Sequence, residues 1–227
     1  MAVRITDRDK KLVSDLALSH LLSRDQILEL GYFSSICRLN TRLRELSAIK
    51  LVRKLETPFF NQSLYMAGPL AHEVVGVHVS KLLESRSNSP RFVRHALSVS
   101  STRIALCRKG GDWRFEQQLW RQLEAKKHIE IRPDGLLLTT SLPVFVEVDL
   151  GHVNPSKFKE KLVGYKALAE SSKCLDLYGF STFRILTVTT GTLRTRRLRK
   201  TLPPNPGFEF LCQTFEEIGA RAIPNWS

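Results

Sequence analysis

Residues 34–46 read SSICRLNTRLREL, and this stretch decides the fold of the first part of the chain. Its two serines can cap a helix, because their hydroxyl oxygens accept bonds from the free amides of a first turn. Apolar side chains then recur at steps of three and four residues, which predicts one buried helix face: Ile36, Leu39, Leu43 and Leu46. The other faces carry polar side chains that suit phosphates and base edges: Arg38, Asn40, Thr41, Arg42 and Arg44.

Two further helical patterns precede this helix, and a hairpin pattern follows it. The first covers residues 6–19 and opens with the capping pattern Thr6-Asp7-Arg8-Asp9, and the second covers residues 23–30. Residues 50–66 read as a strand, a loop and a returning strand. Three helices and a hairpin in this order predict a winged helix-turn-helix, in which a short second helix sets the third across the major groove.

A winged helix-turn-helix predicts a DNA interface. We expect the five polar residues of the third helix to contact DNA, together with three basic residues beside the hairpin: Lys50, Arg53 and Lys54. An arginine can pair with guanine or clamp a phosphate, and the sequence leaves both open. Winged helices also serve as protein-interaction modules, which is the alternative for this domain.

The composition supports a polyanionic partner. The 227 residues hold 35 Lys and Arg against 22 Asp and Glu, for a formal net charge of +13. Such a surface attracts polyanions and favours double-stranded DNA as the partner, although positive charge can also serve solubility alone.

Other features exclude several classes of protein. The sequence has no apolar stretch long enough for a membrane span and no apolar signal-peptide core at its start, so we expect a cytoplasmic protein that does not bind membranes. Four widely spaced cysteines predict buried free thiols and no zinc site: Cys37, Cys107, Cys174 and Cys212.

The sequence pattern in the middle of the chain predicts a helical connector. A helical stretch is expected over residues 69–84, a polar hinge over 85–90 and a further helix over 91–107. The predicted domains are therefore a winged helix-turn-helix over residues 1–67, a connector over 68–110 and a second domain over 111–227.

The sequence pattern of the second domain predicts helices that alternate with strands. An amphipathic helix is expected over residues 112–127, followed by strands within 129–138 and 143–150, a helix over 155–171 and an apolar strand over 183–189. This order predicts a mixed sheet of the α+β or α/β class.

Three carboxylates gather near the two central strands. Strand alternation puts Glu147 and Asp149 on one face, and Asp134 opens the neighbouring strand. Together they could hold Mg²⁺ or Mn²⁺, which prefer oxygen ligands, and Lys161 on the next helix could stabilise a phosphodiester transition state. The alternatives are a strand end that faces solvent and a structural network with nearby basic residues: Arg132, Lys159 and Lys161.

The motifs Pro133-Asp134-Gly135 and Glu147-Val148-Asp149, the second at the end of an apolar strand, resemble the PD-(D/E)XK nuclease superfamily. The resemblance implies that Asp134 and Glu147 are metal ligands and that a lysine two positions after Glu147 is catalytic. Asp149 stands at that position in this sequence, and Lys161 on the following helix is the matching candidate.

The order of motifs along the chain resembles the replication-relaxation family of plasmid and mobile-element proteins, which joins a winged helix to a restriction-endonuclease-like domain. The similar motifs are residues 6–9, 95–99, 133–135 and 147–151, and Lys161 with Tyr165. The resemblance implies a role in plasmid replication, copy control or conjugative DNA processing.

A basic run over residues 193–200 predicts a second DNA-contacting surface. As a helix, it would hold Leu193 and Leu198 near the core. The remaining positions are expected to contact phosphates, with a solvated helix face as the alternative: Arg194, Arg196, Arg197, Arg199 and Lys200.

Three functions are open at this point. The first is a double-stranded DNA-binding protein whose nuclease-like domain is inactive. The second is a Mg²⁺- or Mn²⁺-dependent endonuclease that uses the three carboxylates and Lys161. The third is an adaptor that recruits a relaxase or a replication initiator. A homodimer would suit a helix-turn-helix protein that reads two half-sites.

Overall fold

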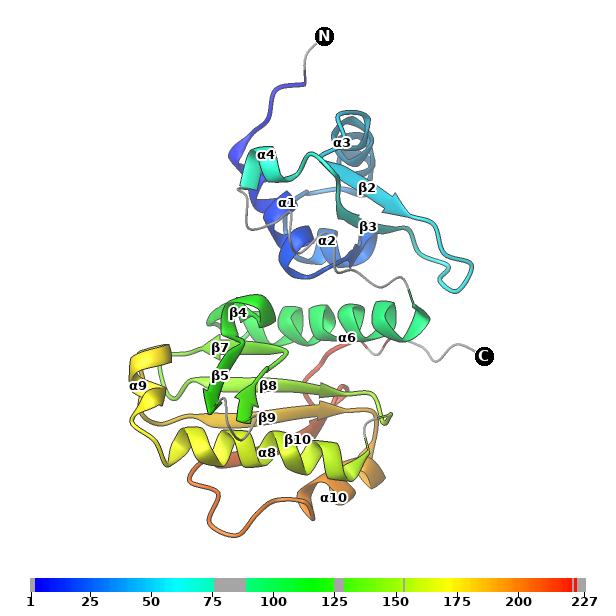
Figure 1. Ribbon diagram of the computed structural model, residues 1–227. Coiled ribbons are helices and arrows are strands. Elements are labelled where there is room, and N and C mark those ends of the chain that lie inside the picture. Colours follow the sequence, from blue (N-terminus) through cyan, green and yellow to red (C-terminus); the bar gives the residue numbers. More distant parts are fainter. Residues whose placement is uncertain (1–2, 76–88, 125–128, 153, 222, 224–227) are drawn as a thin grey trace. The chain divides into compact units, whose positions relative to one another are not determined.

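The computed structural model of the chain describes residues 3–75, 89–124, 129–152, 154–221 and 223. These residues form two compact units, one within Met1–Ile104 together with Ile223 and one within Ala105–Ala222. Each unit contains helices and strands (Figure 1), and the sheets are antiparallel or mixed. The protein is therefore of the mixed α and β class that the sequence predicts.

The N-terminal unit begins with three helices: α1 (Asp7–Leu18), α2 (Arg24–Glu29) and α3 (Ile36–Ala48). Reciprocal capping boxes open α1 and α2, formed by Thr6 with Asp9 and by Ser23 with Gln26. An antiparallel sheet in the order β1-β3-β2 completes the unit's first part: β1 (Leu22–Ser23), β2 (Val52–Leu55) and β3 (Leu64–Ala67). The three predicted helices and the hairpin are confirmed, and their arrangement as a DNA-binding winged helix stays a prediction.

Little of the predicted connector before residue 89 is described. Helix α4 covers His72–Val75, at the start of the helix predicted over residues 69–84. Residues 76–88, with most of the predicted hinge, lie outside the described residues. Across the described part of the chain, we find no helix with the length and apolar character needed to cross a membrane.

Helix α6 (Pro90–Cys107) confirms the helix predicted over residues 91–107. Its residues up to Ile104 belong to the N-terminal unit. There the Gln26 side chain, which also caps α2, donates to the backbone carbonyl of Leu97 at 2.8 Å. This buried bond joins α6 to the helices that precede it.

The C-terminal unit is built on a five-stranded sheet in the order β10-β9-β8-β7-β4 (Figure 1). Three strands run parallel: β8 (Val144–Asp149), β9 (Arg184–Thr189) and β10 (Glu209–Thr214). Two pair antiparallel with their neighbours: β7 (Gly135–Leu138) and β4 (Asp112–Phe115). A separate two-stranded sheet joins β5 (Arg121–Glu124) to β6 (Ile129–Ile131).

The helix predicted over residues 112–127 is wrong. In its place the chain forms β4, the short helix α7 (Glu116–Leu119) and β5. Gly110 and Gly111 both have positive φ angles, which end α6 and turn the chain into a strand. Trp113 then packs over Gly135 of β7, where a Cβ atom would come within 1.9 Å of the indole ring. The aromatic residues of this segment follow the two-residue period of a strand and not a helical one.

Three further helices complete the C-terminal unit: α8 (Pro155–Ala169), α9 (Lys173–Tyr178) and α10 (Thr192–Arg199). The buried Tyr165 of α8 packs against Phe145 of β8, with ring centroids 5.4 Å apart. On α10, Leu198 is buried as predicted, but Leu193 is 70% exposed. The buried face of α10 consists of Thr195 and Leu198, three residues apart, and Leu193 falls outside it.

Candidate functional site

Helix α3 carries the first group of residues that the sequence predicts to contact DNA. Its leucines are buried in the core: Leu39, Leu43 and Leu46. The predicted contact residues on the remaining faces are exposed, with Asn40 partly buried: Arg38, Asn40, Thr41 and Arg44. Arg38 Nη1 donates to the hydroxyl of Ser34 at 3.3 Å, so its guanidinium stays at the first turn of α3.

Two predictions about the same turn are wrong. Ile36 is 40% exposed and does not belong to the apolar face, and Cys37 is exposed and not buried. Both residues precede Leu39, the first buried residue of α3, and lie in a turn that does not pack against the core. Among the other cysteines, Cys174 and Cys212 are buried free thiols as predicted, whereas Cys107 is partly exposed.

Arg42 differs from the other polar residues of α3, because its guanidinium is bound within the protein. Its side chain is 14% exposed. Nε and Nη2 donate to the two carboxylate oxygens of Asp9 at 2.9 and 2.6 Å, and Nη1 donates to Glu45 at 2.5 Å. Nη2 also donates to the backbone carbonyl of Arg4 at 2.7 Å. Arg42 thus ties α1 and the segment before it to α3, and its donors are directed away from solvent.

The Asp9 carboxylate makes the stability of the N-terminal unit dependent on pH. Burial raises its pKa, but the bonds from Arg42 and Thr6 outweigh burial and lower the pKa from 3.8 to about 2. A pKa below that of the unfolded chain means that the ionised group stabilises the fold above pH 3.8, and that this contribution is lost as the pH falls toward 2. We expect urea unfolding at falling pH to show a steeper loss of stability in the wild type than in Asp9→Asn, and parallel curves would contradict this assignment.

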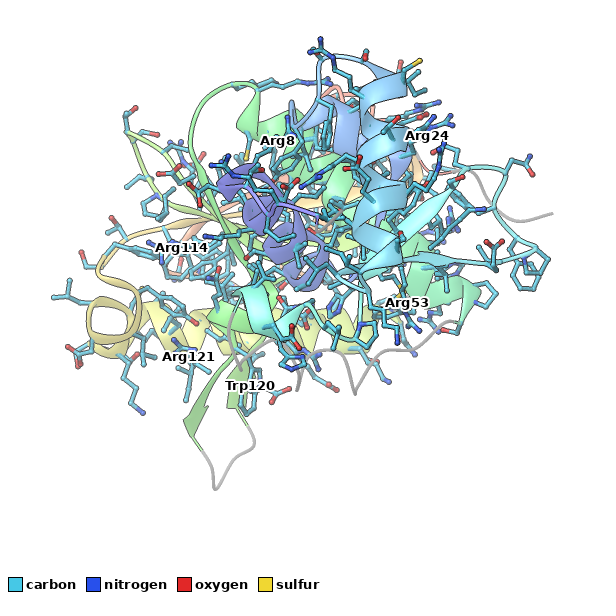
Figure 2. The ribbon with its side chains drawn as sticks, turned by 90° about the horizontal axis from the view of Figure 1, so that it is seen from above. Arg8, Arg24, Arg53, Arg114, Trp120 and Arg121 are labelled. Atoms are coloured by element: carbon cyan, nitrogen blue, oxygen red, sulfur yellow. The ribbon has the colours of Figure 1, made fainter. Side chains whose placement is uncertain are left out.

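A cavity of about 480 Å³ is formed by the segment before α1, the first turn of α1 and α3. Four arginines and one glutamate line it: Arg4, Arg8, Arg38, Arg42 and Glu45. The guanidinium of Arg8, labelled in Figure 2, lies 4.5 Å from the centroid of the Phe33 ring, which also lines the cavity. The sequence predictions missed Arg4 and Arg8, although Arg4 lies just before the capping pattern at residues 6–9 and Arg8 lies within it.

The basic residues predicted beside the hairpin are exposed: Lys50, Arg53 and Lys54. Lys50 has a positive φ of 59° in the turn between α3 and β2, and Arg53 lies on β2 (Figure 2). Lys54 forms an exposed ion pair of 3.1 Å with Glu56. These residues lie close in sequence to the end of α3, so the structure keeps them in the same unit as the exposed face of that helix.

Glu147 of β8 is the centre of the predicted carboxylate site, and both of its oxygens are bound. Lys161 Nζ donates to one oxygen at 2.5 Å, and the Tyr165 hydroxyl donates to the other at 2.7 Å. Asp134 lies within electrostatic range and accepts a bond of 2.7 Å from the amide of Val148. The predicted association of Asp134, Glu147 and Lys161 is therefore present in the geometry.

Burial and the neighbouring charges together shift the pKa values of this cluster. Burial raises the pKa of Glu147 to about 7, with Asp134 adding to the rise and Lys161 opposing it. Burial would lower the pKa of Lys161, but the carboxylates of Glu147 and Asp134 raise it above its ordinary value. The pKa of Tyr165 is also raised, by burial and by the neighbouring Glu147.

Asp149 is held by a different partner from Glu147. Arg194 of α10 binds it through two bonds, from Nε to Oδ2 at 2.6 Å and from Nη2 to Oδ1 at 3.0 Å. The Thr189 hydroxyl also donates to Asp149, at 3.1 Å, and the Asp149 side chain is 3% exposed. Within the described residues, no three His, Cys, Asp or Glu side chains lie where they could hold a metal ion together. Asp149 is thus paired with Arg194, and among the described residues it does not form one group with Asp134 and Glu147.

The basic residues of α10 include one largely buried arginine, and the others are exposed. Arg194 is directed inward to Asp149, in contrast to its predicted contact with phosphate. Arg199 donates to the backbone carbonyl of Cys212 at 3.1 Å. Apart from Arg194, the predicted contact residues of this run are all exposed: Arg196, Arg197, Arg199 and Lys200.

Comparison with solved structures gives only a distant likeness. The crystal structure of protein VC1899 from Vibrio cholerae aligns over 95% of this chain at 13% identity, with a TM-score of 0.33. The chain spans 55% of the length of that protein. A search of curated proteins found no match.

Comparison with protein families gives a firm assignment. The model of the family described as replication-relaxation matches residues 14–183, a span that includes α2, α3, the hairpin, α6 and the carboxylate strands. This family points to a role in the replication or relaxation of plasmid and mobile-element DNA. Because the match covers well over half of the 227 residues, the chain belongs to the replication-relaxation family.

Proposed function

We propose that this protein binds double-stranded DNA of a plasmid or mobile element, with α3 and the β2–β3 hairpin as a winged helix-turn-helix. The observation that carries the proposal is the exposed face of α3. There Arg38, Thr41 and Arg44 project from a helix whose opposite face is fixed in the core by three leucines. A rigid helix with this surface suits the major groove, and the net charge of +13 favours binding to phosphates.

The C-terminal unit supports a scaffold role better than cleavage. A hydrolytic metal site needs carboxylate oxygens that are available to the ion. Both oxygens of Glu147 accept bonds from Lys161 and Tyr165, and both oxygens of Asp149 accept bonds from Arg194. These residues do not fit the predicted Mg²⁺ or Mn²⁺ site. We infer that the nuclease-like domain is a docking unit, with the exposed cations of α10 as a second contact for DNA.

Binding of this kind would serve plasmid replication, copy control or conjugative DNA processing. A relaxase or a replication initiator is the class of protein that such a DNA-bound docking unit would recruit. A homodimer would allow two copies of α3 to read two half-sites one helical turn apart.

The experiment combines supercoiled plasmid and linear duplex DNA with the protein at low salt, with and without Mg²⁺ or Mn²⁺. We expect a mobility shift that weakens with salt and no strand breakage. Arg38→Ala should weaken binding by roughly 1–3 kcal/mol, as for an arginine at a base edge. Lys10→Ala removes an equal charge from an exposed position of α1 and is the matched control.

Two results would overturn the proposal in different ways. Metal-dependent nicking that disappears in Glu147→Ala would make the protein an endonuclease centred on the β8 carboxylates. Absent or salt-insensitive DNA binding would leave the adaptor function, in which the exposed face of α3 contacts a protein.

A further inference from the structure

The cavity beside α3 brings together cations from two places in the sequence. Arg4 comes from the segment before α1 and Arg8 from the first turn of α1, whereas Arg38 comes from α3. We call this surface the arm cavity. All three arginines are exposed, and within the described part of the chain none of the three is paired with a carboxylate. The arm cavity is therefore a concave surface on which these three positive charges exceed the negative charge of the lining.

Arg42 also lines the arm cavity, but it does not add to the positive charge of the other three arginines. Its single positive charge faces two carboxylates, those of the buried Asp9 and of Glu45, so this group offsets part of the charge of Arg4, Arg8 and Arg38. The bond from Arg42 to the Arg4 carbonyl fixes the backbone of the segment before α1 against α3. The backbone at Arg4 is therefore held in place before any ligand binds.

The other two arginines are also held in place. Arg8 lies over the Phe33 ring, and Phe33 is itself 6% exposed and part of the core. Arg38 donates to Ser34. Cations whose positions are fixed lose less conformational entropy when they bind an anion, so they suit a repeated anionic ligand better than mobile lysines do.

We propose that the arm cavity binds the phosphate backbone of double-stranded DNA, and that Arg4 and Arg8 position the duplex against α3. This inference rests on the proposed function and adds a second contact to it. Contacts to phosphates set the register of a protein on DNA without reading its sequence. Arg4 and Arg8 would then contact phosphates and fix where α3 enters the groove, while Arg38, Thr41 and Arg44 on the exposed face of α3 read bases.

The first test measures the affinity of Arg4→Ala/Arg8→Ala for several duplexes over a range of salt concentrations. Loss of two phosphate contacts lowers the slope of log K against log salt by about 2, and binding weakens to the same extent for every sequence. Lys10→Ala removes one charge from α1 outside the arm cavity and should leave the slope within about 0.5 of the wild type. Circular dichroism and thermal unfolding of each variant confirm that the fold is intact.

The second test uses Cys37, an exposed thiol that lines the arm cavity. Duplex DNA should slow the alkylation of Cys37 several-fold in the wild type, read by mass spectrometry of the peptide. The protection should disappear at high salt and in Arg4→Ala/Arg8→Ala. The buried Cys174 and Cys212 serve as internal references, because DNA does not change their access to the reagent.

The outcomes separate this inference from the function on which it rests. DNA binding with an unchanged salt slope in Arg4→Ala/Arg8→Ala, and no protection of Cys37, would overturn the role of the arm cavity and leave α3 as the DNA-binding element. Failure of the wild-type protein to bind any duplex at low salt would overturn the proposed function itself.

Discussion

Arg42→Ala is expected to destabilise the N-terminal unit by about 3–5 kcal/mol, the cost of removing one partner of a buried ion pair. Asp9 is fully buried, and two of the guanidinium nitrogens of Arg42 bind its carboxylate. The variant leaves that carboxylate buried with only the Thr6 cap as a partner. Urea unfolding gives the size of the loss, and hydrogen exchange of the α1 and α3 amides shows that it lies in this unit.

The matched control is Arg44→Ala, which removes the same charge from an exposed position of α3. Its stability should stay within about 0.5 kcal/mol of the wild type, as for most surface substitutions. The double variant Asp9→Asn/Arg42→Met, which removes both charges, should recover part of the loss of Arg42→Ala. Equal stabilities of Arg42→Ala and Arg44→Ala would show that Arg42 does not hold α1 to α3.

The local elements of the N-terminal unit are predictable from sequence, because their signals are local. The capping boxes at Thr6 and Ser23 form as the pattern indicates, and the leucine period fixes the buried face of α3. The role of Arg42 is not predictable in the same way. Its partner Asp9 lies 33 residues earlier, and a helical period shows only that position 42 is beside the buried face.

The wrong helix at residues 112–127 has a different cause. Trp113 and Phe115 fit a strand, and the apolar residues that follow them are also compatible with a helix. The strand is favoured by a contact with Gly135, which lies on another strand and leaves room for the indole ring of Trp113. Because that contact is not local, the periodicity of the segment alone could not decide between the two structures.

The carboxylate site is only partly predictable, because its strand pattern is local but its cationic partners are not. Strand alternation correctly places Glu147 and Asp149 as neighbours on β8, and both are buried. Their cationic partners come from two different helices, 14 residues away for Lys161 and 45 residues away for Arg194. The sequence contains both cations but does not show that Arg194 binds Asp149.

Arg194→Ala is expected to destabilise the C-terminal unit by about 3 kcal/mol, again because it leaves a buried carboxylate unpaired. Asp149 is 3% exposed and keeps only the bond from Thr189 once the two bonds from Arg194 are lost. Thermal or urea unfolding should show the loss, and Asp149→Asn/Arg194→Met should reverse part of it.

Arg196→Ala, on the exposed side of the same helix, separates the structural role of α10 from its proposed contact with DNA. Its stability should stay within about 0.5 kcal/mol of the wild type. If α10 contacts phosphates, Arg196→Ala lowers the salt slope of DNA binding by about 1. Arg194→Ala should instead lose stability while its salt slope stays that of the wild type at temperatures where it is folded, because its guanidinium faces Asp149 and not solvent. A lowered slope in folded Arg194→Ala, with no loss of stability, would mean that Arg194 leaves Asp149 to bind DNA.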